Sequence, residues 1–366
     1  MTKSVYLLIG TYENLFLCYR FDPSSACLKL VFTDQSHSRS VRAVAISASG
    51  RYFASGSGDE TLQLFCSLFD RPRQVGSIHA HESSITCLRF IGDDRLMSVD
   101  DAGSMCIWKV SDCEAPLHTF PKTHKRCAPL DLSIHPSGRL ALTIASGDRT
   151  MRTWDLINLR QAACVPCEQN QDPVCTFWST SGQFYGVLYT RQLCVYNTAN
   201  CELRNSTVFD SNATCAVFMP EMEFVVVGFQ SGQIRSYLSD EGESSVLLES
   251  SAENGRVKAL YAIKSSSDGG FVTSASSTGW LRVFRYCRAN GTLAIEQLAS
   301  TNVGARIISM ATTVQDAHAD DEPNQSKAEN GKKAEKKVKK LKLDINGRMA
   351  KKKRKIMGKK KVVADD

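Results

Sequence analysis

One stretch of the sequence constrains the fold more than any other. Residues 132–155 read LSIHPSGRLALTIASGDRTMRTWD and hold three short apolar runs separated by polar turns that contain glycine. Runs of this length with turn residues between them favour an antiparallel meander of β-strands. A sheet this small cannot bury both of its faces alone, so the chain needs neighbouring copies of the same unit.

Six further copies of this unit occur along the chain, and every copy ends in an aromatic residue. Consecutive closing aromatics are separated by 41 to 47 residues. A period of about 40–45 residues with four strands per unit is the signature of a WD-repeat β-propeller. The sequence therefore predicts an all-β fold, a seven-bladed WD-repeat β-propeller. The closing aromatics are Tyr19, Phe65, Trp108, Trp154, Tyr196, Tyr237 and Phe284.

The two ends of the repeat array complement each other. The first unit has no apolar run before it that can serve as its inner strand, and a last apolar run lies at residues 306–313. We expect this run to complete the first unit, because a ring closed by strands from both ends has no exposed sheet edge there. The domains expected are therefore a propeller at residues 1–315 and a tail at residues 316–366.

Histidine and aspartate residues recur at two points of the repeat. Asp59 and Asp148 each lie six residues before the closing aromatic, whereas in the Trp108 repeat Asp101 is one position early and Ala102 is at the aligned position. In WD repeats such an Asp holds the turn and bonds toward a His at the start of its repeat. A His–Asp pair can also act as a general base, but no nucleophile is placed to go with it. We interpret the following residues as structural locks of the repeats: His37, Asp59, His81, Trp108, His124, Asp148 and Trp154.

The charge of the chain is uneven. The whole sequence has a formal net charge of +7. Residues 316–366 contain 17 Lys or Arg and 9 Asp or Glu, so the tail carries the whole excess and residues 1–315 have a net charge of −1. The tail has no aromatic residue and few apolar ones, so it cannot bury enough surface to offset the entropy of ordering. We expect it to be disordered.

The lysines of the tail are clustered, which is typical of nuclear or nucleolar targeting signals and of RNA-contacting arms. A tail that only increases solubility is the alternative, and a membrane anchor is not favoured because the C-terminus has neither a prenylation Cys nor an apolar face. The candidate targeting and RNA-contact residues are Lys332, Lys333, Lys336, Lys337, Lys339, Lys340, Lys351, Lys352, Lys353, Arg354, Lys355, Lys359, Lys360 and Lys361.

Signals of an enzyme are weak in this sequence. Cys164 and Cys167 form one C-x-x-C motif without a second pair at zinc-ligand spacing. Residues 56–59 resemble a phosphate loop, but their position is that of a blade turn. We therefore expect no catalytic residue, no cofactor and no metal. No apolar run approaches the roughly 18 residues that span a bilayer, so we expect an intracellular protein without a membrane partner.

Several stretches together resemble one WD-repeat family, the p21-activated protein kinase-interacting protein 1 family. They are LSIHPSGRLAL (residues 132–142), RTMRTWDL (residues 149–156), FVTSASSTGWLRVF (residues 271–284) and NVGARIISM (residues 302–310), together with the Lys-rich tail. The chain departs from the family pattern at Thr278, where an Asp is expected, and at Phe284, where a Trp is expected. Both departures concern the packing of a blade.

The resemblance implies two activities. One is assisting maturation of the large (60S) ribosomal subunit in the nucleolus, with pre-60S particle proteins and pre-ribosomal RNA as partners. The other is binding and inhibiting a p21-activated kinase through the regulatory region of that kinase. The leading hypothesis is a non-enzymatic scaffold of ribosome assembly, monomeric outside its complexes and located in the nucleus and nucleolus. The alternatives are the kinase regulator and, third, an enzyme with a site at the centre of the propeller.

Overall fold

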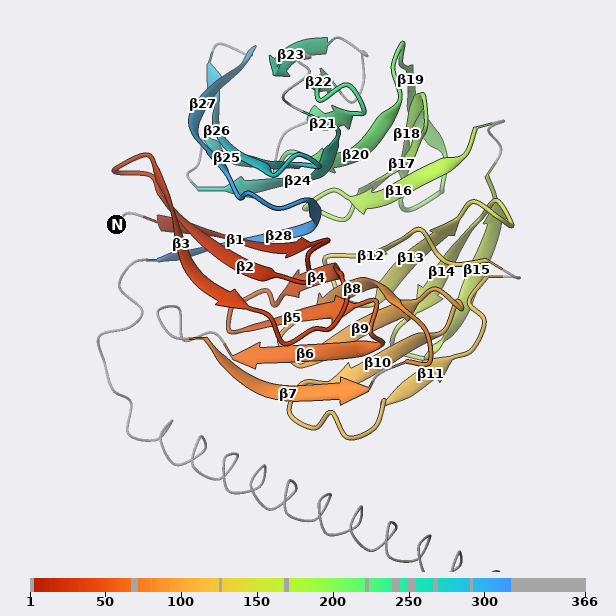
Figure 1. Cartoon of the computed structure of the whole chain (residues 1–366). Helices are drawn as coiled ribbons and strands as arrows, with labels where there is room; N and C mark the ends of the chain where they lie inside the picture. Colours follow the sequence, from red (N-terminus) through yellow and green to blue (C-terminus); the bar gives the residue numbers. More distant parts are fainter. Residues whose placement is uncertain are drawn as a thin grey trace, which may run out of the picture. The chain divides into compact units, whose positions relative to one another are not determined.

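The computed structural model describes residues 3–66, 72–79, 81–124, 127–167, 171–220, 224–238, 244–248, 255–265, 269–289 and 292–316. In this part of the chain every regular element is a β-strand. The strands form seven four-stranded sheets, which follow one another as blades of a ring (Figure 1). The prediction of an all-β, seven-bladed WD-repeat propeller is therefore confirmed. Residues 2–315 belong to one compact unit.

Each sheet runs from an inner strand to an outer strand. The first sheet consists of β28 (Ile307–Asp316), β1 (Lys3–Thr11), β2 (Phe16–Asp22) and β3 (Cys27–Asp34). The second consists of β4 (Val41–Ile46), β5 (Tyr52–Ser57), β6 (Thr61–Cys66) and β7 (Arg73–His79). The third consists of β8 (Ile85–Ile91), β9 (Arg95–Asp100), β10 (Met105–Lys109) and β11 (His118–Phe120). The fourth sheet consists of β12 (Asp131–Ile134), β13 (Leu140–Ala145), β14 (Thr150–Asp155) and β15 (Arg160–Pro166). The fifth consists of β16 (Pro173–Trp178), β17 (Phe184–Tyr189), β18 (Gln192–Asn197) and β19 (Leu203–Val208). The sixth sheet consists of β20 (Ala213–Phe218), β21 (Phe224–Phe229), β22 (Ile234–Leu238) and β23 (Ser244–Leu248). The seventh consists of β24 (Val257–Lys264), β25 (Gly269–Ser276), β26 (Trp280–Ala289) and β27 (Thr292–Asn302).

The turn between β12 and β13 shows how the repeat sequence directs the chain. Gly138 N donates to His135 O at 2.8 Å. The φ angle of Gly138 is 68°, a left-handed conformation that glycine adopts without steric cost. The turn thus reverses the chain inside the HPSG motif, and the two strands pair in antiparallel register from Asp131↔Ile144 to Ile134↔Ala141.

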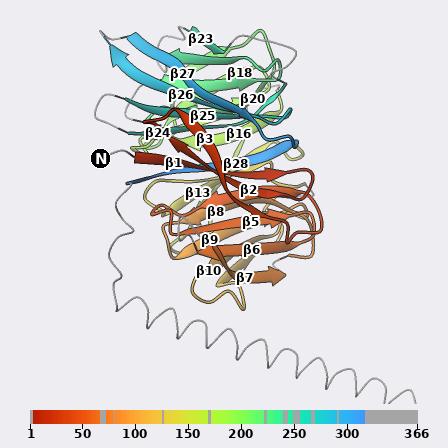
Figure 2. The ribbon, with the colours of Figure 1, turned by 60° about the vertical axis from the view of Figure 1, so that its left-hand side comes forward.

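One blade combines strands from both ends of the described chain. β28 is the inner strand of the sheet that continues with β1, β2 and β3, and Figure 2 shows the two end strands alongside each other. Tyr12 N donates to Arg306 O at 2.9 Å where they meet. A Cβ atom at Gly10 would lie 2.6 Å from both Ser309 Oγ and Val41 O. Glycine is needed at this position because β28 and β4 approach β1 so closely.

Apolar side chains fill the space between neighbouring blades. Six of the seven closing aromatics are buried, and Tyr196 is half-buried. Between the closing blade and the next one, Phe16, Phe32, Phe53 and Phe65 form an aromatic cluster in which Phe53 and Phe65 stack at 5.1 Å. Burying one such side chain stabilises the fold by roughly 1.5–3 kcal/mol, so these clusters hold the blades to one another.

Candidate functional site

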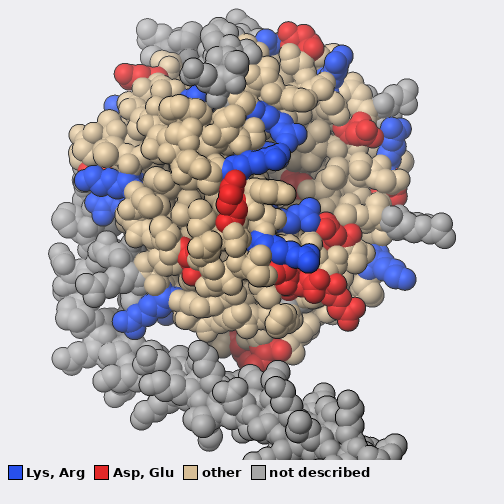
Figure 3. Space-filling view, viewed as in Figure 1, with Lys and Arg blue, Asp and Glu red and all other residues tan. Residues whose placement is uncertain are grey.

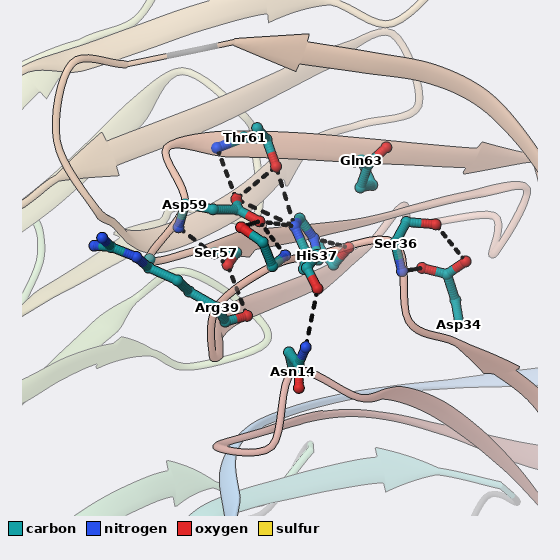
Figure 4. A network of polar contacts seen from close by, with 12 residues as sticks. Asn14, Asp34, Ser36, His37, Arg39, Ser57, Asp59, Thr61 and Gln63 are labelled. Atoms are coloured by element: carbon teal, nitrogen blue, oxygen red, sulfur yellow. Dashed lines mark hydrogen bonds and ion pairs between the residues drawn. The ribbon is translucent and has the colours of Figure 1, made fainter.

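The first polar network joins the entry to β4 with the turn between β5 and β6 (Figure 4). The side chain of His37 is fully buried, with Nδ1 3.2 Å from Asp59 Oδ2 and Nε2 2.9 Å from Ser55 Oγ. The Asp59 carboxylate also accepts the backbone N–H groups of Ser38, at 2.8 Å, and Thr61, at 3.0 Å. Asp59 therefore links the turn to the segment that leads into the inner strand of the same blade.

The second network has the same arrangement and adds a tryptophan. His124 Nδ1 lies 3.1 Å from Asp148 Oδ1, and His124 Nε2 lies 2.9 Å from Thr143 Oγ1. Trp154 Nε1 donates to the same Thr143 oxygen at 2.9 Å. Asp148 Oδ1 also accepts the backbone N–H of Thr150 at 3.2 Å. One network of hydrogen bonds thus joins the segment before β12, strand β13, the turn after it and strand β14.

The direction of these hydrogen bonds follows from the two ends of the network. An indole N–H only donates and an ionised carboxylate only accepts, so Trp154 donates to Thr143 Oγ1 and His124 Nδ1 donates to Asp148. In a neutral ring His124 Nε2 is then an acceptor, and it takes the hydroxyl proton of Thr143. Burial lowers the pKa of His124 and of His37 and outweighs the opposing effect of the Asp partner in each network, consistent with neutral rings.

The third network uses an aspartate that the repeat pattern did not single out. His81 Nδ1 lies 2.9 Å from Asp100 Oδ2, while His81 Nε2 and Trp108 Nε1 lie 2.6 Å and 2.8 Å from Ser98 Oγ. Asp101, the aspartate nearest to the aligned position, instead forms an ion pair with Arg42 at 2.6 Å.

Asp100 reaches the histidine from the last position of β9 and not from the turn itself. Its Oδ1 accepts the backbone N–H of Ser104 at 2.7 Å, as Asp59 Oδ1 accepts that of Thr61. The two carboxylates therefore make equivalent contacts from different positions, which a search at fixed spacing misses. The hydroxyl groups of Ser55, Ser98 and Thr143 were also missed, although each lies ten or eleven residues before a closing aromatic.

An ion pair joins the inner strands of two neighbouring blades. Arg89 Nη2 is 3.2 Å from Asp131 Oδ1, and Asp131 Oδ2 accepts the backbone N–H of Thr176 at 3.1 Å. Burial raises the pKa of Asp131 despite the attraction of Arg89. Burial also raises the pKa of the Cys87 thiol, on the same strand as Arg89, to about 12. A thiol with so high a pKa is a poor nucleophile at neutral pH.

Five of the inner strands carry a β-bulge near their first residue, and each bulge inserts one extra residue. A bulge re-aims the side chain of the extra residue. Three of the extra residues bond to the protein: Arg42 pairs with Asp101, Thr86 Oγ1 donates to Val99 O at 3.2 Å, and Thr214 Oγ1 donates to Val257 O at 2.7 Å. The extra residues are Arg42, Thr86, Val174, Thr214 and Lys258.

Comparison with known proteins places this architecture in a family. The WD domain, G-beta repeat, matches residues 28–66, 72–109 and 114–155. A protein of Xenopus laevis, "p21-activated protein kinase-interacting protein 1-like", is 32% identical over 289 residues, which are 78% of this chain and 75% of the relative. The chain belongs to the p21-activated protein kinase-interacting protein 1 family. A Danio rerio protein, also named "p21-activated protein kinase-interacting protein 1-like", is 30% identical over 78% of this chain and 74% of the relative. A Schizosaccharomyces pombe protein, "Shk1 kinase-binding protein 15", is 23% identical over 74% of this chain and 75% of the relative.

The candidate site residues of this family member fall into two groups. The seven expected lock residues lie in the three networks, with Phe65 in the place of a tryptophan in the first of them. The basic residues expected to act in targeting, Lys332 to Lys361, lie outside the described residues. Their role stays a prediction.

The described residues were compared with what a disulfide, a metal site or a membrane-spanning helix requires. All fourteen cysteines are free, including the exposed Cys164 and the half-buried Cys167. Within the ranges that the structure describes, no three His, Cys, Asp or Glu side chains are grouped so that they can hold a metal ion. No helix in those same ranges is long and apolar enough to cross a membrane.

Proposed function

We propose that the chain is a non-enzymatic scaffold that assists assembly and maturation of the large (60S) ribosomal subunit in the nucleolus. The proposal is supported by membership of the family and by the contrast between a near-neutral propeller and a Lys-rich tail. The contrast carries most weight, because clustered lysines suit import into the nucleus and contact with RNA phosphates. The expected partners are pre-60S particle proteins, held by the propeller, and pre-ribosomal RNA, held by the tail.

The polar networks support a scaffold in preference to an enzyme. In each network both histidine nitrogens and the carboxylate are engaged in hydrogen bonds that hold a turn. A general base needs a nitrogen or oxygen within hydrogen-bond reach of a substrate proton. We infer that the His–Asp pairs stabilise the blades and take no part in catalysis.

Affinity purification of the full chain followed by sequencing of the bound RNA tests the proposal. We expect precursors of the large-subunit RNA and proteins of the pre-60S particle to co-purify. A matched purification of the chain with Lys351 to Lys355 replaced by alanine, directed to the nucleolus by a fused signal, separates targeting from binding. Recovery of neither the RNA nor the particle proteins from the wild-type chain would contradict the proposal.

A second candidate function is regulation of a protein kinase. It is favoured by the names of the relatives, which describe proteins that interact with a p21-activated kinase or bind the Shk1 kinase. On this proposal the propeller binds the regulatory region of a p21-activated kinase and holds it inactive. An RNA-free complex with such a kinase in the same purification would favour this function over ribosome assembly.

A further inference from the structure

Lys258 differs from the other polar residues at the bulges of the inner strands. Arg42, Thr86 and Thr214 each bond to a neighbouring blade or strand. Lys258 is half-buried at the start of β24, and within the described ranges its ammonium group has no hydrogen bond and no ion pair. Partial burial of a cation without a counterion is unfavourable, so the structure leaves this charge uncompensated.

Two arginines lie next to this lysine. Arg256 precedes Lys258 by two residues, and Arg306 comes directly before β28, the inner strand of the neighbouring blade. Ala259, near the start of β24, and Ile307, the first residue of β28, belong to the one apolar cluster that these two blades share. Arg306 is held in place by its backbone N–H, which donates to the Glu13 carboxylate at 3.0 Å, and its guanidinium lies 5.6 Å from the centre of the Tyr12 ring.

The three cations repel one another. Burial lowers the pKa of Lys258, and the positive charges of Arg256 and Arg306 lower it further. Like charges that converge in this way favour binding of an anion, which removes the repulsion. Figure 3 shows Lys and Arg residues gathered near the middle of one face of the molecule, with acidic residues beside them.

We propose that Arg256, Lys258 and Arg306, the basic trio, form a docking site for an acidic peptide segment of a partner protein. The inference rests on the proposed scaffold function and adds the chemistry of one contact. Arg256 and Lys258 are two residues apart, so their Cα atoms lie within roughly 7 Å of each other. An extended peptide with alternating Asp or Glu residues presents its carboxylates at a comparable interval, and each can pair with one cation of the trio.

An acidic peptide fits this surface better than RNA does. The propeller has a net charge of −1 over residues 1–315, and Glu13 lies directly beside the trio. A nucleic acid carries a negative charge on every nucleotide and would be repelled by the acidic residues around so small a basic site. A short acidic segment places its charges only where the three cations are.

Lysine footprinting on the full chain tests the proposal. A twelve-residue peptide of alternating Glu and Ser is the probe, the same peptide with Gln in place of Glu is its matched control, and acylation of each lysine is measured by mass spectrometry. A carboxylate beside an amine raises its pKa by about 1 unit or more, which lowers the free amine available for acylation about tenfold. We expect the Glu peptide to slow acylation of Lys258 by roughly that factor and the Gln peptide to leave it unchanged. Because the readout is specific to one residue, binding of the peptide to the basic tail does not disturb it.

Variants separate the trio from other basic residues. Arg256→Gln and Arg306→Gln should each reduce the protection of Lys258, whereas Arg42→Gln, at an equivalent bulge but already paired with Asp101, should retain it. Unchanged acylation of Lys258 at saturating Glu peptide would overturn the proposal. So would stronger protection by a single-stranded oligonucleotide of uridine than by the Glu peptide, because the occupant would then be RNA. Failure here leaves the RNA-sequencing test of the scaffold unaffected, so the two proposals fail separately.

Discussion

His124 and Trp154 share one hydrogen-bond partner, the hydroxyl group of Thr143. Each lies 2.9 Å from that oxygen, and the indole N–H can only donate. The Asp148 carboxylate can only accept, so His124 Nδ1 carries the proton and His124 Nε2 accepts the hydroxyl proton of Thr143. The hydroxyl group thereby joins an aromatic side chain of the blade core to a buried His–Asp pair.

Replacing Trp154 should destabilise the propeller in two measurable steps. Trp154→Phe removes the indole donor and leaves Thr143 partly unsatisfied, so the free energy of unfolding should fall by about 1–3 kcal/mol. Trp154→Ala also opens a cavity and should lower it by about 3–5 kcal/mol. Urea unfolding followed by circular dichroism measures both. Trp178→Phe is the control, because the indole of half-buried Trp178 makes only a 3.5 Å contact with Ser133 O, and an equal loss there would contradict the role of the network.

Two adjacent aspartates should differ strongly in their contribution to stability. Asp100 holds the buried His81, with both side chains almost inaccessible, whereas Asp101 pairs with Arg42 at a site where both side chains are more than a third exposed. Asp100→Ala should lower the free energy of unfolding by about 1–3 kcal/mol, and Asp101→Ala by less than about 1 kcal/mol. Chemical denaturation of the pair measures the difference. A larger loss for Asp101→Ala would show that the wrong aspartate has been assigned to the network.

Stability should fall as the pH is lowered from 7 to 5. The pKa values of His37 and His124 lie below the ordinary value of 6.5 because the rings are buried. The folded chain thus binds fewer protons than the unfolded chain, and the stability present above pH 6.5 is lost as the pH falls through the folded values. The pKa of Asp59 is lowered to about 2 because hydrogen bonds from Thr61 and Ser38 outweigh burial, so its contribution is lost only at more acidic pH. The buried Asp131 has a raised pKa, so its effect on stability has the opposite sign. The stability due to this group rises as the pH falls into the acidic range.

Urea midpoints at pH 7.5, 6.5 and 5.5 check this expectation. His37→Gln keeps a polar side chain that does not titrate, so its midpoint should change less with pH than that of the wild-type chain. An equal slope in wild type and His37→Gln would show that other groups determine the pH dependence.

Removing either end of the ring should destabilise all of it. A chain that ends at Asn302 lacks β28, and a chain without residues 1–10 lacks nearly all of β1. Either change leaves an unpaired strand in the closing blade and exposes the apolar cluster that Ile307 shares with Val5. Melting curves by circular dichroism should move to lower temperature for both. A chain that ends at residue 316 is the control, and identical melting of all three would contradict closure of the ring by these strands.

Removing the tail should affect location and RNA contact but not stability. Without residues 317–366 we expect a nearly unchanged melting temperature and loss of nucleolar accumulation of a fluorescent fusion. Replacing Lys351 to Lys355 by alanine should have the same effect on location, whereas replacing the four lysines by arginine should not. Binding of the isolated tail to single-stranded RNA should weaken with salt, with a log–log slope of about −0.7 per phosphate neutralised. Nucleolar accumulation of the alanine variant would assign localisation to the propeller.

The fold was predictable because the repeat is visible in the closing aromatics. Their spacing indicates seven blades even though only Trp108 and Trp154 are tryptophans, since burial of a large ring matters more to the blade than the indole itself. Phe65 shows the reason: its apolar neighbours, among them Phe53, replace the hydrogen bond that an indole would make.

Other features could not be predicted because they depend on three-dimensional distance. Asp100 makes the contacts of Asp59 from a strand end, and a fixed spacing gives no sign of this. The basic trio joins residues from two blades, and a bulge decides where Lys258 points. Position along the chain alone does not show that the charge of Arg306 acts on Lys258.

The pairing of β28 with β1 also has a consequence for how the protein is made. β1 leaves the ribosome well before β28, its partner about 300 residues later in the chain. At roughly 5–20 residues per second of translation, that interval lasts on the order of 15–60 seconds. During this interval the first blade has an open inner edge, and its apolar side chains, such as Leu7 and Ile9, lack the neighbours that bury them in the finished ring. Completion of the ring is therefore a late event of synthesis.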